Sequence, residues 1–298
     1  MGDPERQQRT GTSMSREEHF DALLPAEMAV KAEQLGVAKA QQARSRTFAL
    51  AVLAGAFIAI GAVFSTTVIA GAADALPIGV TRLLAGLAFS VGLILVSVGG
   101  AELFTGNTLM VMAWVSGRVG TRHLLESWAI AFAGNAVGAL ATALLVFASG
   151  QYQFWGGAVG AAALAGAAHR LSFGFTQAVA LGVLGNALVC LAVWLSFSAR
   201  SSADRIACVV PPIAAFVAAG FEHCIANLYF VPIGLMILHG APPEFWSAID
   251  ASPQDFAQLG VARFLMRNLL PVALGNVIGG GALVGGVYWF VYLRGRSP

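Results

Sequence analysis

Two short stretches with the same polar pattern place carboxylates inside apolar sequence. GAELFTGN covers residues 100–107 and GFEHCIAN covers residues 220–227, and each has Gly first, Glu third and Asn eighth. Glu102 and Glu222 therefore hold equivalent places, 120 residues apart. A charged side chain at the centre of a membrane-spanning helix costs about 2.5–3.5 kcal/mol on insertion scales. Each carboxylate must therefore face protein or water and needs a partner.

The glycines around these carboxylates predict a break in each helix. Gly100 and Gly106 flank the first carboxylate, and Gly220 precedes the second. An unwound helix leaves backbone N–H groups without partners, and a carboxylate can accept hydrogen bonds from two or three of them. We predict that each Glu holds a break together, and a role as a proton carrier is the alternative. The residues assigned to the breaks are Gly100, Glu102, Gly106, Asn107, Gly220, Glu222 and Asn227.

The first break would favour an anion. The half-helix that resumes after Gly106 has a partly positive N-terminus, which attracts negative charge. Thr105 adds a hydroxyl donor at the same point. The apolar runs contain no Lys or Arg that could hold the anion tightly, and weak donors without a tight trap suit conduction.

His223 is the residue of the second motif that can change its charge near neutral pH, because its unperturbed pKa is about 6.5. It follows a carboxylate at a symmetry-related break, so we predict a role in the pathway, and a packing role is the alternative. By lending a proton, it could convert an anion into a neutral acid, which loses less hydration in a narrow apolar slit. Bulky apolar residues beside the breaks could form that slit, namely Phe89, Leu93, Leu103 and Phe216.

The composition indicates a polytopic membrane protein. Hydrophobic residues make up 57% of the 298 residues and charged residues 11%, and the mean hydropathy is +0.75. Water-soluble domains average about 25% charged residues. Eight runs contain no charged residue: 47–73, 83–101, 103–117, 127–169, 171–199, 206–221, 223–243 and 268–293.

Two of the predicted spans are interrupted by a carboxylate. A spanning helix needs about 20 apolar residues, and Glu102 alone separates 83–101 from 103–117. In the same way, Glu222 alone separates the two runs between residues 206 and 243. Each joined segment is too long for one straight helix, so we predict one broken span in each.

The remaining runs complete an all-α membrane protein with six spans in two inverted three-helix repeats. In the long run 127–169 we predict a helix to about Ser149 and then a Gly/Ala-rich loop. The third and sixth spans share the pattern Gly-Asn-x-x-Gly, at 134–138 and 275–279, and glycines at this spacing let helices approach closely. Three spans per half give the halves opposite orientations, so the broken helices meet near the membrane centre.

The basic residues predict that both chain ends lie in the cytoplasm. With six spans, the cytoplasmic segments would carry 13 Lys and Arg residues and the outer loops 4, as the positive-inside rule requires. We predict a cytoplasmic segment 1–46, a channel domain 47–293 and a cytoplasmic tail 294–298. Residues 21–42 have the pattern of an amphipathic helix, which would act either as a surface anchor or as a movable plug.

No residue pattern indicates enzyme chemistry or a bound cofactor. The three cysteines lie in apolar runs without metal-ligand spacing. No phosphate-binding loop, HExxH or GxSxG motif occurs. We therefore expect no cofactor, metal or nucleic-acid partner, and we expect a small anion and the lipid bilayer as partners.

The motifs resemble those of the formate/nitrite transporter family, in particular its FocA-type formate channels. GAELFTGN, GFEHCIANLYFVPIG and LLPVALGNVIGGG occur in the family's order, and the resemblance extends from about residue 20 onward. It implies an aquaporin-like fold and a pentamer with one pore per subunit, in the inner membrane of a bacterium. The implied activity is bidirectional transport of formate and similar small monovalent anions, with closure by the N-terminal helix at low pH.

The resemblance also implies roles for individual residues. His223 corresponds to the family's central pore histidine, Thr105 to its loop threonine and Asn186 to its pore-facing asparagine. Arg170 stands where a lysine is common, and we expect it to attract anions at an outside loop that forms the entrance. The apolar slit of the family corresponds to Phe89, Leu93, Leu103 and Phe216.

Two alternative substrates stay open. Gly106 stands where formate channels often carry Ser, so nitrite or another small anion is the first alternative. The second is a neutral solute, as in aquaporins, although the Asn-Pro-Ala motif of aquaporins is absent.

Overall fold

The structure, a computed structural model, describes residues 22–72 and 75–295. The outer ends of the two predicted terminal parts, residues 1–21 and 296–298, lie outside the described residues, and so does the first residue of the expected amphipathic helix. Over the described ranges the chain forms helices and no strand. The expectation of an all-helical protein is therefore met in that part of the chain.

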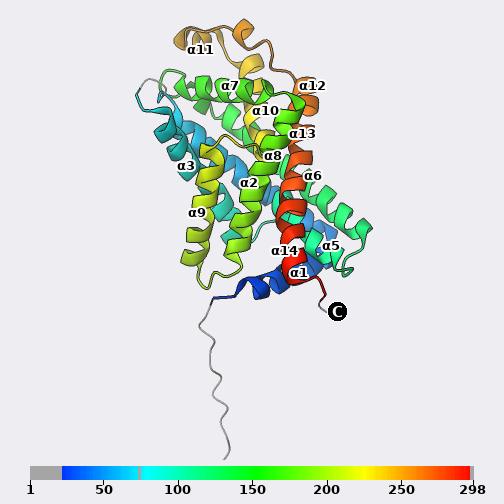
Figure 1. Ribbon diagram of the computed structural model, residues 1–298. Helices are drawn as coiled ribbons and strands as arrows, with labels where there is room; N and C mark the ends of the chain where they lie inside the picture. Colours follow the sequence, from blue (N-terminus) through cyan, green and yellow to red (C-terminus); the bar gives the residue numbers. More distant parts are fainter. Residues whose placement is uncertain (1–21, 73–74, 296–298) are drawn as a thin grey trace, which may run out of the picture.

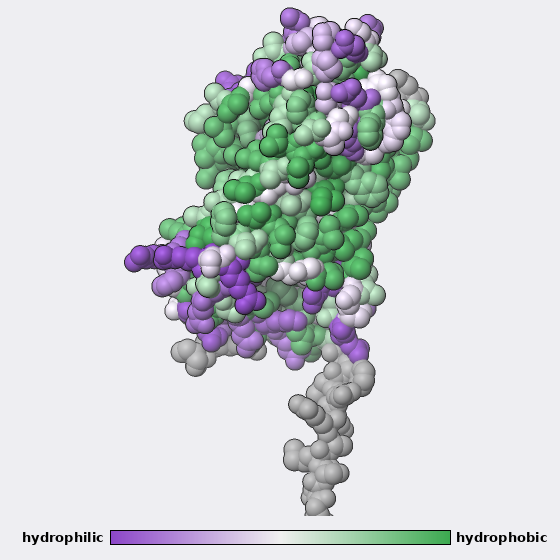
Figure 2. All heavy atoms as spheres, turned by 180° about the vertical axis from the view of Figure 1, so that it is seen from behind, coloured by the Kyte–Doolittle hydropathy of each residue, from purple (hydrophilic) through white to green (hydrophobic). Residues whose placement is uncertain are grey.

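Five helices of the described part are long and apolar enough to cross a membrane. Figure 2 shows hydrophobic residues over the middle of one face, with hydrophilic residues gathered at both ends. The first four long helices are α2 (Arg44–Ile69), α3 (Ile78–Gly99), α6 (Thr121–Ala148) and α8 (Phe175–Ser196). The fifth lies within Pro253–Tyr292. From residue 261 it is a continuous run of α12 (Val261–Arg263), the π-helix η4 (Phe264–Leu269), α13 (Leu270–Val277), the π-helix η5 (Ile278–Gly286) and α14 (Val287–Tyr292).

Shorter helices lie on either side of the two carboxylate motifs. After α3 come α4 (Phe104–Asn107), the 3₁₀ helix η1 (Thr108–Met110) and α5 (Val111–Val115). At the second motif, α9 (Ser202–Ala218) is followed by α10 (Cys224–Gly240). The chain leaves the helix at Gly100, which has φ 76°, and at Gly220, which has φ 75°. Such left-handed backbone favours glycine, and extended residues then lead into α4 and α10.

The two Gly-Asn-x-x-Gly patterns lie where helix backbones nearly touch. A Cβ atom on Gly138 of α6 would lie 1.9 Å from the Val52 carbonyl oxygen of α2. On Gly279, at the start of η5, it would lie 2.1 Å from the Val183 carbonyl oxygen of α8. Both distances are far below van der Waals contact, so only glycine permits either approach.

The loop that we predicted after Ser149 is wrong for most of its length. The chain forms η2 (Gln151–Gln153) and then α7 (Ala158–Leu171). Alanine is the strongest helix former, and small side chains let α7 pack tightly on α10. Gly234 of α10 lies so close that a Cβ atom there would be 2.6 Å from the Ala167 Cβ. The Gly/Ala-rich composition therefore marks a close-packed helix.

Helix α1 (Pro25–Gln41) lies across one end of the molecule, beside the C-terminal end of α14 (Figure 1). Helices α7 and α11 (Pro243–Ala248) lie at the opposite end, and η3 (Pro253–Phe256) follows α11. Met28, Ala29 and Ala32 of α1 are buried in a cluster with residues from α5, α8 and the end of α14. The two ends of the molecule are named below the α1 end and the α7 end.

Candidate functional site

An asparagine from α6 holds the first break. The Asn135 Oδ1 accepts a hydrogen bond from the Phe104 backbone N–H at 2.9 Å. Its Nδ2 donates to the carbonyl oxygens of Ala51, at 2.7 Å, and Glu102, at 2.9 Å. One buried amide thus binds a backbone N–H and a carbonyl oxygen of the break and ties them to α2, because it offers an acceptor and two donors.

The second break repeats this arrangement with Asn276 of α13. Its Oδ1 accepts from the Cys224 N–H at 2.9 Å, and its Nδ2 donates to the carbonyl oxygens of Gly182, at 2.8 Å, and Glu222, at 3.1 Å. We had assigned the backbone N–H groups to the carboxylates, and that assignment is wrong. The amide of an asparagine in the Gly-Asn-x-x-Gly pattern accepts from the backbone at each break.

The Glu102 carboxylate binds side chains. Its Oε2 accepts from the Lys39 Nζ at 2.5 Å and from the Asn107 Nδ2 at 2.9 Å. The Lys39 Nζ also donates to the Asn107 Oδ1 at 2.9 Å. Lysine, carboxylate and amide therefore form a closed triad. Lys39 comes from α1, so α1 supplies the counter-charge for the buried Glu102.

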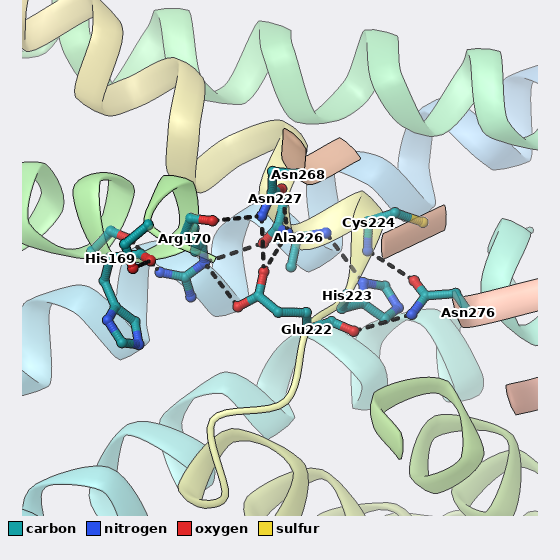
Figure 3. A network of polar contacts seen from close by, with 11 residues as sticks. His169, Arg170, Glu222, His223, Cys224, Ala226, Asn227, Asn268 and Asn276 are labelled. Atoms are coloured by element: carbon teal, nitrogen blue, oxygen red, sulfur yellow. Dashed lines mark hydrogen bonds and ion pairs between the residues drawn. The ribbon is translucent and has the colours of Figure 1, made fainter. Parts of the chain in front are cut away.

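The Glu222 carboxylate lies in a matching triad at the α7 end (Figure 3). Its Oε2 accepts from the Asn227 Nδ2 at 2.7 Å and from the Asn268 Nδ2 at 3.3 Å. The Arg170 Nε donates to the Asn227 Oδ1 at 3.1 Å and lies 4.0 Å from the Glu222 Oε1.

The structure places Arg170 in the last turn of α7, whereas we had expected it in an outside loop. Its guanidinium stacks 3.8 Å above the centre of the Phe230 ring. The positive charge of Arg170 is compensated by the buried carboxylate of Glu222, which lies 4.0 Å away.

Thr105 of the first break and His223 of the second break are in hydrogen-bond contact. The Thr105 Oγ1 lies 2.8 Å from the His223 Nε2, and the Ala226 backbone N–H donates to the His223 Nδ1 at 3.1 Å. A nitrogen that accepts a hydrogen bond carries no proton, so the neutral ring has its proton on Nε2. His223 therefore caps the N-terminus of α10 with one nitrogen and donates to Thr105 with the other.

Asn186 of α8 contacts the backbone of Thr105. Its Nδ2 lies 3.2 Å from the Thr105 carbonyl oxygen, 3.2 Å from the Thr108 hydroxyl and 2.6 Å from the Asn276 carbonyl oxygen. Its Oδ1 is buried and has no hydrogen-bond partner among the described residues. Asn186 thus links the Thr105 segment to the asparagine that holds the second break.

Two cavities approach the Thr105–His223 contact from opposite ends of the molecule. The α7 cavity, of about 300 Å³, has Phe89, Phe216 and His223 among its lining residues. The α1 cavity, of about 360 Å³, is lined in part by Leu93 and Leu103. Thr105 itself is fully buried. The four apolar residues of the expected slit therefore divide between the two cavities.

No residue pattern in the sequence identified Lys39 or Asn268 as the partner of a buried carboxylate. Lys39 lies in a polar helix outside the apolar runs, 63 residues before its partner. Asn268 stands at the very start of an apolar run, where a polar residue is common. An intramembrane carboxylate requires a counter-charge, and that requirement was the only hint that such partners exist.

The comparisons with known proteins agree with this architecture. The family model described as formate/nitrite transporter matches residues 26–290. The formate channel FocA of Escherichia coli (strain K12) is 47% identical over 281 residues, which cover 94% of this chain and 98% of that channel. The formate channel FocA of Haemophilus influenzae is 40% identical over 264 residues, with 89% and 93% covered.

A solved structure, described as a pentameric formate channel with formate bound, is also similar. It is 45% identical and superposes with a TM-score of 0.80 over 84% of this chain and 98% of that chain. The family match spans nearly all of the described residues. The chain belongs to the formate/nitrite transporter family.

Proposed function

We propose that this protein transports formate and similar small monovalent anions in both directions across the inner membrane of a bacterium. The names of its relatives support this substrate, and so does the description of the similar solved structure. The observation that carries the proposal is the pair of cavities on either side of the buried Thr105–His223 contact, where His223 lines the α7 cavity and the neighbours Leu103 and Gly106 line the α1 cavity. Basic side chains line both cavities, as an anion pathway requires.

The proposed arrangement in the membrane has six spans in two inverted repeats. The spans are α2, α3 with α5, α6, α8, α9 with α10, and the run from α12 to α14. The matching roles of Asn135 and Asn276 support the repeat, because each satisfies three equivalent backbone groups. By analogy with the similar solved structure, the working assembly is a homopentamer, and the distribution of basic residues favours cytoplasmic ends for the chain.

We propose that an anion passes between Thr105 and His223 through two apolar constrictions. Phe89 and Phe216, whose ring centres lie 6.0 Å apart, form the constriction at the α7 end, and Leu93 and Leu103 form the other. The Thr105 hydroxyl and the His223 Nε2–H, which now bind each other, would turn to the anion as it passes.

Proton transfer from His223 would require the ring to change its contacts. Only an imidazolium can lend a proton and return to the neutral form, and an imidazolium carries a hydrogen on Nδ1. The Ala226 N–H occupies that nitrogen. We therefore propose that the neutral ring serves as a hydrogen-bond donor, and that any proton coupling depends on the ring leaving the α10 N-terminus.

Closure at acidic pH is proposed for the α1 end. Helix α1 lines the α1 cavity with Lys31, Leu35 and Lys39, so a shift of α1 would change the access to the pathway. A fixed anchor that supplies Lys39 to Glu102 is the alternative role.

The test is uptake of labelled formate into proteoliposomes as a function of pH. Saturable formate uptake, with weaker competition by nitrite, supports the proposal. Stronger transport of nitrite than of formate would favour the alternative anion. Flux of a neutral solute without any flux of formate or nitrite would contradict both, and would favour the neutral-solute alternative.

A further inference from the structure

Two arginines form reciprocal contacts between α3 and α9. Arg82, near the start of α3, donates from Nε to the carbonyl oxygen of Ala218, the last residue of α9, at 2.9 Å. Arg205, near the start of α9, lies with its Nη1 at 3.4 Å from the carbonyl oxygen of Ser97, near the end of α3. The helices are therefore antiparallel, and each arginine lies at the end of the partner helix where the chain breaks.

Each arginine also lines one of the two cavities. Arg82 lies in the α7 cavity with Arg170 and Glu222, and Arg205 lies in the α1 cavity with Lys39 and Glu102. Both arginine side chains are partly exposed. The guanidinium of Arg82 lies directly over Gly220, where a Cβ atom would be 2.4 Å from Nη2. The glycine of the second motif thus also makes room for a cation.

Two other cations of the cavities, Lys39 and Arg170, are called the deeper cations here. They differ from Arg82 and Arg205 in how their positive charge is compensated. Lys39 and Arg170 each lie within 4.0 Å of a buried carboxylate. In the described ranges no such ion pair involves Arg82 or Arg205, whose hydrogen bonds go to neutral carbonyl oxygens. With each deeper cation offset by its Glu, the uncompensated positive charge of the α7 cavity falls on Arg82. In the α1 cavity it is shared by Arg205 and Lys31.

We propose that Arg82 and Arg205 capture the anion, one in each cavity, before it reaches the Thr105–His223 contact. This inference rests on the proposed function. A guanidinium offers a planar fork of N–H donors that fits a carboxylate. Each arginine donates one hydrogen bond to the partner helix, which fixes its position and leaves its other N–H groups for the anion.

A purely structural role for these residues makes a different prediction. As a clamp, either arginine needs only a hydrogen-bond donor that reaches a carbonyl oxygen, and glutamine also supplies one. As a capture residue, it needs the positive charge, which lysine keeps and glutamine loses. Glutamine and lysine variants therefore separate the two roles.

The experiment measures formate flux in liposomes and formate current in planar bilayers for Arg82→Gln, Arg82→Lys, Arg205→Gln and Arg205→Lys. Each glutamine variant is expected to raise KM by about three- to tenfold at low ionic strength and to leave the maximal rate within about twofold. The difference from the native protein should disappear near 1 M salt, where the screening length falls to about 3 Å. The lysine variants should stay near the native KM.

The end of the channel at which formate is supplied gives a second measurement. Arg82→Gln should reduce current when formate is supplied at the α7 end, and Arg205→Gln when it is supplied at the α1 end, so the two variants should rectify in opposite directions. Matched controls are Arg263→Gln and Arg122→Gln, since both arginines are exposed and line neither cavity.

Three outcomes separate the inference from the proposed function. Glutamine variants with the native KM and native salt dependence would overturn the capture role. An equal rise in KM in the glutamine and lysine variants would also overturn it, because lysine keeps the positive charge. A native protein that carries no formate would refute the proposed function itself, whatever the variants do.

Discussion

Replacing His223 separates its two roles. The ring accepts a hydrogen bond from the Ala226 N–H through Nδ1 and meets Thr105 through Nε2. Asparagine is among the best helix N-caps, so His223→Asn should keep the cap on α10 and lose the Nε2 donor. His223→Ala should lose both. The pair of variants therefore tests the cap and the pathway contact independently.

The magnitudes follow from these contacts. Loss of an N-cap costs about 1 kcal/mol, within a range of about 0.5–2, and His223→Ala also leaves a void where a buried ring was packed. We expect His223→Ala to unfold at a temperature at least about 2–4 °C lower than the native protein. For His223→Asn we expect a smaller change, because the α10 cap is kept.

The functional assay is formate uptake between about pH 5 and 8, with an internal dye to follow proton movement. Asparagine cannot be protonated in this range, so His223→Asn should pass formate as an electrogenic leak without proton movement, while any closure by α1 at acidic pH should remain. Native proton-coupled uptake in His223→Asn would show that the imidazole is not the proton carrier. A His223→Ala protein as stable as His223→Asn would refute the capping argument.

Three further perturbations test the break and its partners. Asn276→Ala removes the side-chain partner of the Cys224 N–H and of the Gly182 and Glu222 carbonyl oxygens. We therefore expect a loss of at least about 1–3 kcal/mol, measured by thermal unfolding, and native stability would contradict the role of this amide. Glu222→Ala should reduce the yield of assembled protein in size-exclusion chromatography more than it changes the ratio of formate to nitrite flux, whereas Glu222→Gln, which keeps an acceptor, should assemble better. Removal of residues 1–40 also removes Lys39, so we expect a channel that is less stable than the full-length protein and closes less at acidic pH. Identical flux–pH curves for the truncated and full-length proteins would show that α1 acts only as an anchor.

The sequence predicted the position of the breaks because their signals are local. A glycine before an isolated carboxylate, inside an apolar run, marks a place where a helix must open, and the chain does open at Gly100 and Gly220. The same kind of signal failed for residues 150–169. A Gly/Ala-rich run lacks the bulky periodicity that identifies a helix, although α7 forms there through close backbone packing.

The partners of the carboxylates could not be predicted because they come from distant segments. Periodicity identifies an element and the face it buries, but it does not say which side chain of another element will meet it. Asn135 and Asn276 lie within the recognised Gly-Asn-x-x-Gly patterns, but those patterns do not indicate which groups the two amides bind. Their bonds to the broken backbone depend on the register between α6 and α4, and between α13 and α10.

The two triads also differ in a way that bears on regulation. Both pair a carboxylate with an asparagine five residues later and with one basic side chain. At the α7 end the base is Arg170, whose helix packs closely on α10 through Gly234 and Ala167. At the α1 end the base is Lys39, whose helix precedes the first repeat. Departure of α1 would leave Glu102 buried without its cation, a cost of about 3–5 kcal/mol for a buried pair. The contact of Lys39 with Glu102 therefore opposes movement of α1, which is the movement that closure at this end would require.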